Sequence, residues 1–375
     1  MIWNGRITNN IYERACMINI IDCSTKEFKR RTVDKRIFLF GAGTRAQMFY
    51  KYLALGDKVE AIVDNNEKLH NTEWTVSKKI SIINLYDFIM LVNQTDISSL
   101  VLLVTPMFFA MDIIEQLNNC IELSGLECYI GSLLITHYDK KEFEFTLGEP
   151  KIPKKIHYCW FGKNEIPDNL KQYMKSWRKY CPDYEIVRWD ESNYDITKNR
   201  YMYEAYRNKK WSFVSDCARL DIIYNEGGIY LDTDVELIAS LDRLVNDEMF
   251  CGAISEIGIG LGLGFGASKH NYLTKELRDA YDEVSFYNTD GSLNLCPCTE
   301  YQAPILEKYG FKICNEYQYI NGHVIYPSEV LSPIMHGDVS IFTERTVSIH
   351  HNANSWLSEA ERASWNKFKM YGVSQ

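Results

Sequence analysis

The chain has 375 residues, of which 46% are hydrophobic and 24% are charged. At roughly 100–200 residues per domain, this length predicts two or three domains, and the composition excludes a mainly disordered chain. The net charge of −9 argues against a nucleic-acid partner, which needs a basic surface. The 11 Cys are scattered and no apolar leader precedes them, so we expect reduced thiols in a cytoplasmic protein.

The sequence predicts no membrane-spanning segment. The longest apolar stretch, 100–111, is interrupted by Thr105 and Pro106 and is shorter than the ~20 residues that span a bilayer. Residues 365–371 mix aromatic and basic side chains, which suggests at most peripheral contact with the inner face of a membrane.

The N-terminal part predicts a small α/β domain. Residues 1–35 are mixed and charged, and we expect an N-terminal arm or helix there. The domain itself is placed at 36–148, because two prolines between residues 149 and 153 disfavour regular structure on both sides. Within it, strands are predicted over 36–40, 59–64 and 99–104, and helices over 47–55 and 111–123.

A glycine-rich turn follows the first of these strands. Gly41 and Gly43 precede the helix, and the next strand ends at Asp64. This order resembles the dinucleotide-binding fingerprint, with Ala46 in place of the third glycine, and implies a Rossmann-like domain. Because glycines let backbone N–H groups approach a phosphate, Gly41, Gly43 and Asp64 are candidates for a nucleotide site. The alternative is a docking or spacer domain without a ligand, like those attached to bacterial polysaccharide-biosynthesis enzymes.

The C-terminal part begins with a strand, a helix and a second strand. The first strand starts at residue 155 and ends in Trp160 and Gly162. Residues 167–180 have helical apolar spacing, and 184–190 predicts the second strand. A strand–helix–strand order implies two parallel strands joined by a right-handed connection.

A short helix follows, with a charged pair on one face. Asp216 and Arg219 are spaced i, i+3, so both side chains point from the same side of the helix. Gly227 and Gly228 then end the helix, as glycine commonly does at a helix C-terminus.

A strand with two carboxylates comes next. Ile229 and Leu231 are predicted to face one side, and Tyr230, Asp232 and Asp234 the other. Two carboxylates that converge suit Mg²⁺ or Mn²⁺, which is typically bound through one or two carboxylates together with substrate phosphates. Such a cation would stabilise the charge of a departing nucleoside diphosphate.

Together these motifs resemble the D-x-D glycosyltransferases with a sugar-binding region. That family includes yeast-type α-mannosyltransferases and bacterial capsule enzymes, and the clostridial toxin glucosyltransferases are related to it. The resemblance covers roughly residues 150–360. It implies a nucleotide-diphospho-sugar transferase (GT-A type) catalytic domain over 149–375, which transfers sugar with retention at the anomeric carbon.

The resemblance also implies a role for each motif residue. Trp160 would stack on the nucleobase, and Asp216 and Arg219 would hold the donor sugar and diphosphate. Tyr230 and Asp232 would contact the ribose and the sugar, and Asp234 would ligate the metal directly. Asp216, Arg219, Asp232 and Asp234 are therefore the predicted catalytic residues.

The end of the chain resembles the closing H-x-x-x-x-S-W element of the same family. His350 is the preferred metal-side histidine, and His351 is the alternative. Imidazole can ligate a divalent metal or hydrogen-bond a diphosphate. Ser355 is a further candidate ligand, and Trp356 a candidate contact to the donor.

Alternate glycines between residues 258 and 266 depart from the common pattern of the family. As a strand, this segment would present a bare face that a substrate or another chain can approach closely. The alternative is a flexible loop over the site. The glycines are Gly258, Gly260, Gly262, Gly264 and Gly266.

The predicted function is transfer of a sugar from a nucleotide-diphospho-sugar, with UDP favoured, to a glycan or lipid-linked acceptor in bacterial capsule or surface-polysaccharide synthesis. Three alternatives stay open. Asp232 could be the nucleophile of a haloacid-dehalogenase-like phosphatase. The N-terminal domain could be an NAD(P)-linked oxidoreductase. A degenerate transferase could serve as a scaffold.

Overall fold

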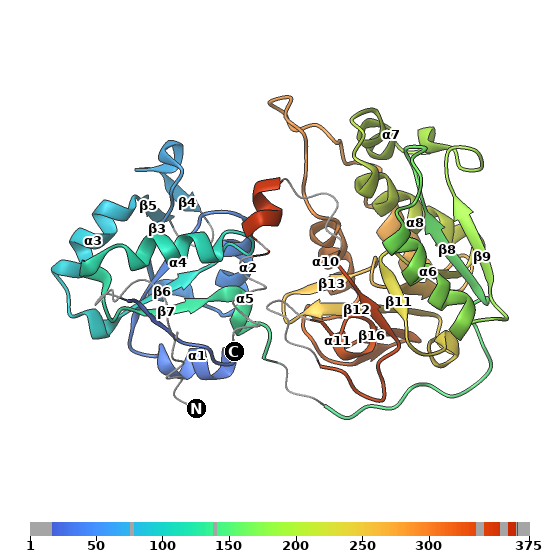
Figure 1. Ribbon diagram of the computed structural model, residues 1–375, viewed down its shortest axis with the longest axis horizontal. Coiled ribbons are helices and arrows are strands. Elements are labelled where there is room, and N and C mark those ends of the chain that lie inside the picture. The colour runs from blue at the N-terminus through green and yellow to red at the C-terminus, as the bar shows by residue number, and fades with distance from the viewer. Residues whose placement is uncertain are drawn as a thin grey trace. The chain divides into compact units, whose positions relative to one another are not determined.

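The computed structural model describes residues 17–75, 79–137, 141–334, 341–352, 359–364 and 366. They form two α/β units, each with its own main sheet (Figure 1). The first unit contains the described residues up to 137 and those from 359 on, and the second contains 141–334 and 341–352. Ser355, Trp356 and all of 365–371 except residue 366 lie outside the described residues.

The first unit is built on a seven-stranded sheet with the order β1-β7-β6-β2-β3-β5-β4. Neighbouring strands run parallel except at the edge, where β4 is antiparallel to β5. The strands are β1 (Asn19–Ile20), β2 (Arg36–Phe40), β3 (Val59–Val63), β4 (Glu73–Thr75), β5 (Lys79–Ile83), β6 (Leu100–Val104) and β7 (Glu127–Ile130). The helices are α1 (Thr25–Arg31), α2 (Thr44–Tyr52), α3 (Leu85–Asn93), α4 (Ala110–Asn118) and α5 (Gly131–Leu134).

Part of the predicted arm belongs to the first unit. Strand β1 pairs with β7, and α1 buries Phe28 edge-on against Tyr129, with 4.8 Å between the ring centroids. Strand β6 is apolar and buried along its whole length, as expected of a parallel strand with both faces covered. The strands predicted over 36–40, 59–64 and 99–104 are therefore confirmed to within one residue.

The second unit contains a mixed eight-stranded sheet. Its order is β15-β16-β12-β14-β10-β8-β9, and β13 pairs with β12 off this path. These strands are β8 (Lys155–Cys159), β9 (Glu185–Trp189), β10 (Gly228–Tyr230), β12 (Met249–Ser255), β13 (Gly258–Gly260), β14 (Phe265–Ala267), β15 (Gln318–Ile320) and β16 (His323–Tyr326). A separate two-stranded sheet pairs β11 (Val235–Leu237) with β17 (Ser348–His350). The helices are α6 (Asp168–Tyr180), α7 (Arg200–Arg207), α8 (Trp211–Glu226), α9 (Tyr272–Asp279), α10 (Cys298–Lys308) and α11 (Ser328–Leu331).

Two apolar clusters cover the two faces of this mixed sheet. Tyr230 of β10 lies in the cluster with α7, α8, α9 and α10, whereas Ile229 and Leu231 lie in the cluster with α6 and α11. The alternation predicted for residues 229–231 is therefore confirmed. Strands β8 and β9, joined through α6, are parallel as predicted.

The segment before the predicted boundary at 148 packs on the second unit. The Arg345 guanidinium lies over the Phe143 ring, 4.5 Å from its centroid, and forms an ion pair with Glu142 at 2.7 Å. The Asn246 side-chain amide donates a hydrogen bond to the Thr146 carbonyl. Because these contacts anchor residues 142–146, the second unit begins earlier in the chain than the prolines predict.

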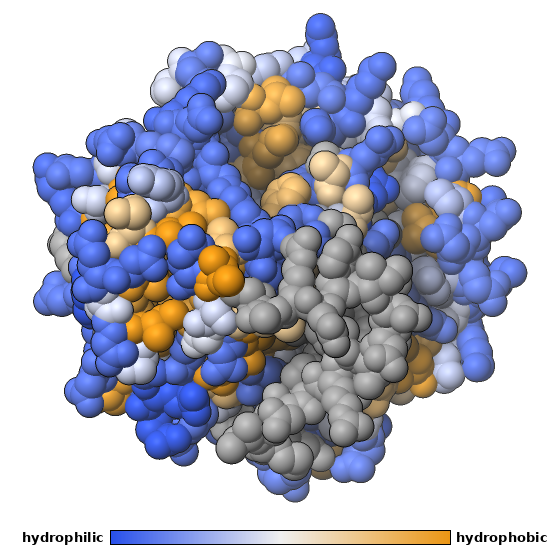
Figure 2. Space-filling model, turned by 60° about the vertical axis from the view of Figure 1, so that its left-hand side comes forward, coloured by the Kyte–Doolittle hydropathy of each residue, from blue (hydrophilic) through white to orange (hydrophobic). Residues whose placement is uncertain are grey.

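Hydrophobic residues show at the surface in patches among hydrophilic ones on the face drawn in Figure 2. Within the described residues, the structure contains no helix with the length and apolar character that crossing a bilayer requires.

A buried histidine links the first strand of the mixed sheet to the end of α8. His157 accepts a hydrogen bond from the Trp189 indole N–H at Nδ1 and faces the Gly227 carbonyl with Nε2, each at 3.0 Å. This arrangement requires a neutral ring with its proton on Nε2. Burial lowers the pKa of His157 to about 4.

We expect His157 to make folding sensitive to acid. Between pH 6.5 and about 4, this histidine binds a proton in the unfolded chain but stays neutral in the folded protein. The free energy of unfolding therefore falls by up to roughly 3 kcal/mol as pH falls through this range. Urea unfolding at pH 7 and pH 4.5 should therefore show a smaller loss for His157→Gln than for the wild type. His270→Gln, which changes an exposed histidine, is the control. Equal losses in all three proteins would contradict this role.

Candidate functional site

Two glycines set the path of the chain into the site. Gly227, at the end of α8, has φ +67°, and Gly228, the first residue of β10, has φ +101°. An added Cβ at Gly228 would lie 2.9 Å from both His157 Nε2 and the Lys155 carbonyl. Since both conformations favour glycine, the helix ends here and β10 lies directly beside β8.

The two carboxylates lie on a turn, and the prediction that they alternate along a strand is wrong. Strand β10 ends at Tyr230, and the Val235 N–H donates to the Asp232 carbonyl at 3.0 Å to close a turn over 232–235. Asp and Thr side chains favour turns because they compete for local backbone hydrogen bonds. The turn nevertheless brings Asp232 and Asp234 together.

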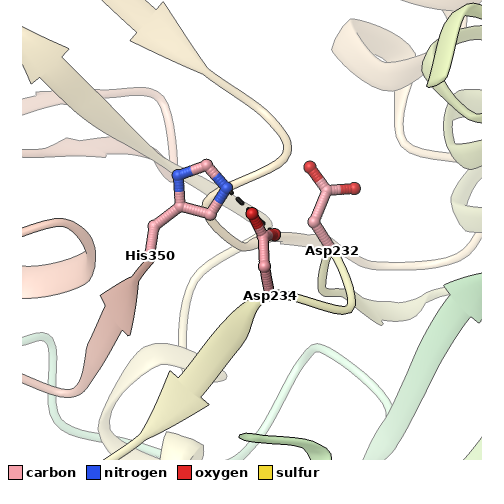
Figure 3. A group of neighbouring side chains, drawn as sticks. All are labelled: Asp232, Asp234 and His350. Atoms are coloured by element: carbon pink, nitrogen blue, oxygen red, sulfur yellow. Dashed lines mark ion pairs between the residues drawn. The ribbon is translucent and has the colours of Figure 1, made fainter. Parts of the chain in front are cut away.

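Strand pairing brings a histidine from the end of the chain to this turn. In the β11–β17 ladder, Val235 lies opposite His350, and the next residue, His351, donates its backbone N–H to the Asp234 carbonyl. The His350 ring faces Asp234, with 3.2 Å between Nε2 and Oδ1 (Figure 3).

The neighbouring histidine faces another partner. The Nε2 atom of His351 lies 2.9 Å from a Glu236 carboxylate oxygen, and its ring stacks on Tyr173 with 3.8 Å between centroids. Of the two histidines, His350 is therefore the one that the structure brings to the carboxylates.

Asp232, Asp234 and His350 each offer a ligand atom within 4.8 Å of the other two (Figure 3). Burial raises the pKa of Asp232, with Asp234 adding to the rise and Arg219 opposing it. Burial disfavours charge on His350, but Asp234 and Asp232 outweigh it and raise its pKa. Two partly buried carboxylates with an imidazole fit a divalent cation that accepts oxygen and nitrogen ligands, as Mn²⁺ does.

A buried guanidinium lies directly behind the carboxylates. Arg219 of α8 is 3% exposed and forms an ion pair with Asp216 one turn earlier on the same helix. Its Nη1 atom lies 3.6 Å from Asp232 Oδ2, and its Cζ lies 5.2 Å from the centroid of the Tyr230 ring. The Tyr230 hydroxyl donates to Asp232 Oδ1 at 3.1 Å. The structure thus brings together Asp216, Arg219, Tyr230, Asp232, Asp234 and His350.

Trp160 lies at the same edge of the sheet. It follows β8, which is parallel to β10 with His157 opposite Tyr230, so both strands direct the chain toward that edge. Its indole N–H donates to the Asn164 carbonyl at 2.7 Å, which fixes the edge of a partly exposed ring. The ring is available for stacking, and its role with a nucleobase stays a prediction.

One glycine of the alternating run is a site residue that sequence reasoning did not single out. The run forms β13, a turn and β14, in place of one continuous strand or loop. In that turn, the Gly262 carbonyl accepts the Asp232 N–H at 3.2 Å. An added Cβ would collide with Asp232 Oδ2 and lie 2.7 Å from Arg219 Nη1. Gly262 therefore makes room for this ion pair.

The glycine turn of the first unit is arranged around its own protein contacts. Gly41 has φ +96°, and an added Cβ would lie 2.7 Å from Pro106, whereas at Gly43 it would meet nothing within 4 Å. The Asp64 carboxylate accepts the backbone N–H groups of Ala42 and Asn66, at 2.7 and 2.8 Å. These bonds occupy the carboxylate of Asp64, which is one of the three candidates for a nucleotide site.

A cavity of about 320 Å³ adjoins this turn. Its described lining contains two carboxylates and no basic side chain, so it offers no side-chain cation for a phosphate. A nucleotide site at Gly41, Gly43 and Asp64 stays a prediction. The lining residues are Phe40, Gly41, Asp64, Asn65, Pro106, Phe109, Asp112, Ile113 and Gln116.

Gly262→Ala is expected to disrupt the site without unfolding the protein. The new methyl group would displace Asp232 or Arg219. The apparent affinity for Mn²⁺, measured by a thermal-shift titration, should therefore fall at least tenfold. The control is Gly258→Ala, whose methyl group would meet only Ile254, at 3.8 Å. Equal Mn²⁺ titrations for the two variants would contradict the assigned role of Gly262.

Comparison with known proteins identifies the segment that carries most of these residues. Residues 167–251 match the family described as a glycosyltransferase sugar-binding region containing the DXD motif. The match includes Asp216, Arg219, Tyr230, Asp232 and Asp234, whereas His350 lies outside it.

Similar curated proteins match over about a third of this chain. Inositol phosphoceramide mannosyltransferase 3 of Schizosaccharomyces pombe is 33% identical over 132 residues, which are 34% of this chain and 37% of that protein. Mannosyl phosphorylinositol ceramide synthase SUR1 of Saccharomyces cerevisiae is 28% identical over 141 residues, covering 36% and 37% of the two chains. The chain thus spans little more than a third of the length of these two relatives.

Likeness to solved structures is weak. The PaToxG glycosyltransferase is 18% identical with a TM-score of 0.34, over 43% of this chain and 70% of that one. A glycosyltransferase involved in glycosylation of the major capsid of PBCV-1 is 12% identical with a TM-score of 0.31, over 57% and 98%. Such TM-scores are too low to infer shared site geometry. The family match confirms the resemblance that the motifs predict: residues 167–251 are similar to a glycosyltransferase sugar-binding region that contains a DXD motif, and this segment carries the D-x-D sequence of Asp232 and Asp234.

Proposed function

We propose that the second unit is a metal-dependent glycosyltransferase that uses a nucleotide-diphospho-sugar. The observation that carries the proposal is the group formed by Asp232, Asp234 and His350, which lies beside the Asp216–Arg219 pair. All of these residues except His350 belong to the matched sugar-binding region. This combination provides a cation site and a fixed positive charge at one place, as a diphosphate leaving group requires.

The charges of the site indicate how the donor is held. Asp232, Asp234 and His350 would hold Mn²⁺ or Mg²⁺, which supplies Lewis-acid stabilisation of the diphosphate. Arg219 keeps Nη2 on Asp216, while its Nε and Nη1 atoms have no hydrogen-bond partner in the described structure. Those two nitrogen atoms can donate hydrogen bonds to the diphosphate of the sugar donor as negative charge develops on this leaving group. Trp160 offers a ring for the nucleobase, with UDP favoured.

Retention at the anomeric carbon is part of the proposal. Asp216 is paired with Arg219, and Asp232 accepts from Tyr230 and faces Arg219, so neither carboxylate is placed as a free nucleophile. The acceptor hydroxyl would attack from the face that the diphosphate leaves, and a phosphate oxygen of the leaving group would take its proton. We propose the GT-A type fold for this unit because it combines a mixed α/β sheet with the matched sugar-binding region.

The proposed acceptor is a hydroxyl group on a glycan or a lipid-linked glycan. The two yeast relatives are named inositol phosphoceramide mannosyltransferase 3 and mannosyl phosphorylinositol ceramide synthase SUR1, and these names support an acceptor carried by a lipid. They do not support the predicted role in bacterial capsule synthesis, which stays a prediction, as does the cytoplasmic location with peripheral membrane contact. The phosphatase and oxidoreductase alternatives leave the matched sugar-binding region without a use.

We expect Mn²⁺-dependent stabilisation by one class of donor. UDP-glucose, UDP-galactose, GDP-mannose and dTDP-glucose are each tested by thermal shift and by slow hydrolysis, with and without Mn²⁺. A saturating donor should raise the melting temperature by about 5 °C, because ligand binding stabilises the folded state by mass action. Release of nucleoside diphosphate, in place of inorganic phosphate, separates a transferase from a phosphatase.

Asp234→Asn should remove the Mn²⁺-dependent shift and lower release of nucleoside diphosphate roughly 100-fold or more, since it removes one ligand and one negative charge. Asp168→Asn makes the same change at an exposed carboxylate, 97% exposed at the start of α6, and should behave as the wild type. Full Mn²⁺-dependent turnover in Asp234→Asn would overturn the proposed site.

A further inference from the structure

Behind the carboxylates, three buried residues carry polar atoms without hydrogen-bond partners. Arg219, Tyr281 and Gln302 are 3%, 0% and 1% exposed. In the described structure, Arg219 Nε and Nη1, the Tyr281 hydroxyl and both amide atoms of Gln302 lack a partner. Native proteins pair the large majority of buried polar groups, so five unpaired atoms on three residues require an explanation.

Helix α10 brings Gln302 to the site. The helix packs against β13, and the turn that follows β13 contains Gly262, which touches Asp232 and Arg219. Cys298 lies one turn before Gln302 on α10, so both side chains are on one face. Burial raises the pKa of the Cys298 thiol, Arg219 lowers it, Asp232 raises it and the adjacent Gln302 amide lowers it.

Tyr281 reaches the same place from the end of α9. Its ring packs on Tyr201 and Tyr301, with centroids 5.1 and 5.3 Å away, and Tyr301 is the neighbour of Gln302 in α10. Burial and Cys298 raise the pKa of Tyr281, and Arg219 lowers it. Aromatic packing holds the ring, and the hydroxyl has no hydrogen-bond partner in the described structure.

These groups have the chemistry of a sugar subsite. A hydroxyl and a primary amide can each donate and accept, which matches the hydroxyl groups of a sugar. Leaving them unpaired lowers the stability of the ligand-free protein, and a bound ligand with matching groups removes that cost.

We propose that Tyr281 and Gln302 hydrogen-bond hydroxyl groups of the transferred sugar and that they select a fully hydroxylated hexose over deoxyhexoses. The inference rests on the proposed function. It assigns these two residues to specificity for the sugar, separate from the metal group of Asp232, Asp234 and His350.

The kinetic test pairs a variant with a modified donor. For the hexose donor that the wild type hydrolyses, Gln302→Met should lower kcat/KM about 10- to 100-fold, the loss expected for an unmade hydrogen bond to a buried group. Among the monodeoxy analogues of that donor, the one that lacks the contacted hydroxyl should suffer a similar loss with the wild type. The two losses should not add when the variant meets that analogue.

A stability test separates a ligand contact from a structural role. In the ligand-free full-length protein, Gln302→Met and Tyr281→Phe remove unpaired polar atoms and should raise the melting temperature by roughly 2–4 °C each. The controls remove hydrogen bonds that the protein makes. Gln318 exchanges two hydrogen bonds with the backbone of Lys312, and the Tyr184 hydroxyl donates one to Asp242. Gln318→Met and Tyr184→Phe should therefore lower the melting temperature.

The outcomes distinguish this inference from the proposed function. Without Mn²⁺-dependent binding of any of UDP, GDP or dTDP to the wild type, the proposed function fails. The assignment of Tyr281 and Gln302 is wrong if two results occur together. One of these diphosphates binds the wild type and both variants equally, and the variants hydrolyse hexose and deoxyhexose donors with the same kcat/KM as the wild type. Lower melting temperatures for both ligand-free variants would also overturn it.

Discussion

The buried charge of Arg219 is the constraint on which the site depends. A guanidinium that is 3% exposed must be paired, because an unpaired buried charge costs several kcal/mol. Asp216 supplies one partner from the same helix, and Asp232 supplies another from the turn after β10. The position of that turn, the tyrosine beneath the guanidinium and the missing side chain at Gly262 all follow from accommodating this one group.

Local sequence patterns predicted the parts of the site that depend on local geometry. The i, i+3 spacing of Asp216 and Arg219 is a property of any helix, and the opposite facing of Ile229 and Tyr230 is a property of any strand. The strands over 36–40, 59–64 and 99–104 were predicted for the same reason, and the structure places them to within one residue. The helix that carries Arg219 is longer than predicted, because its aromatic first turn, from Trp211, packs on α7.

The remaining parts depend on contacts between distant segments, which no local pattern encodes. His350 reaches Asp234 through a ladder that pairs residues more than a hundred positions apart. Nothing in the sequence distinguishes Tyr281 and Gln302 from any other buried tyrosine or helical glutamine. Their unpaired polar atoms become visible only in the structure. The turn at Asp232 was predicted as strand because alternation in an apolar segment outweighs the turn preference of short polar side chains.

The anchoring of residues 142–146 to the second unit also determines where the chain can be cut. A fragment that begins at residue 149, as the prolines suggest, would lose Phe143 from its stacked position on Tyr317 and Glu142 from Arg345. Arg345 is itself buried and pairs with the fully buried Glu329, so part of its charge compensation would be lost with the severed peptide. Expression of the second unit by itself therefore calls for a start point upstream of Glu142.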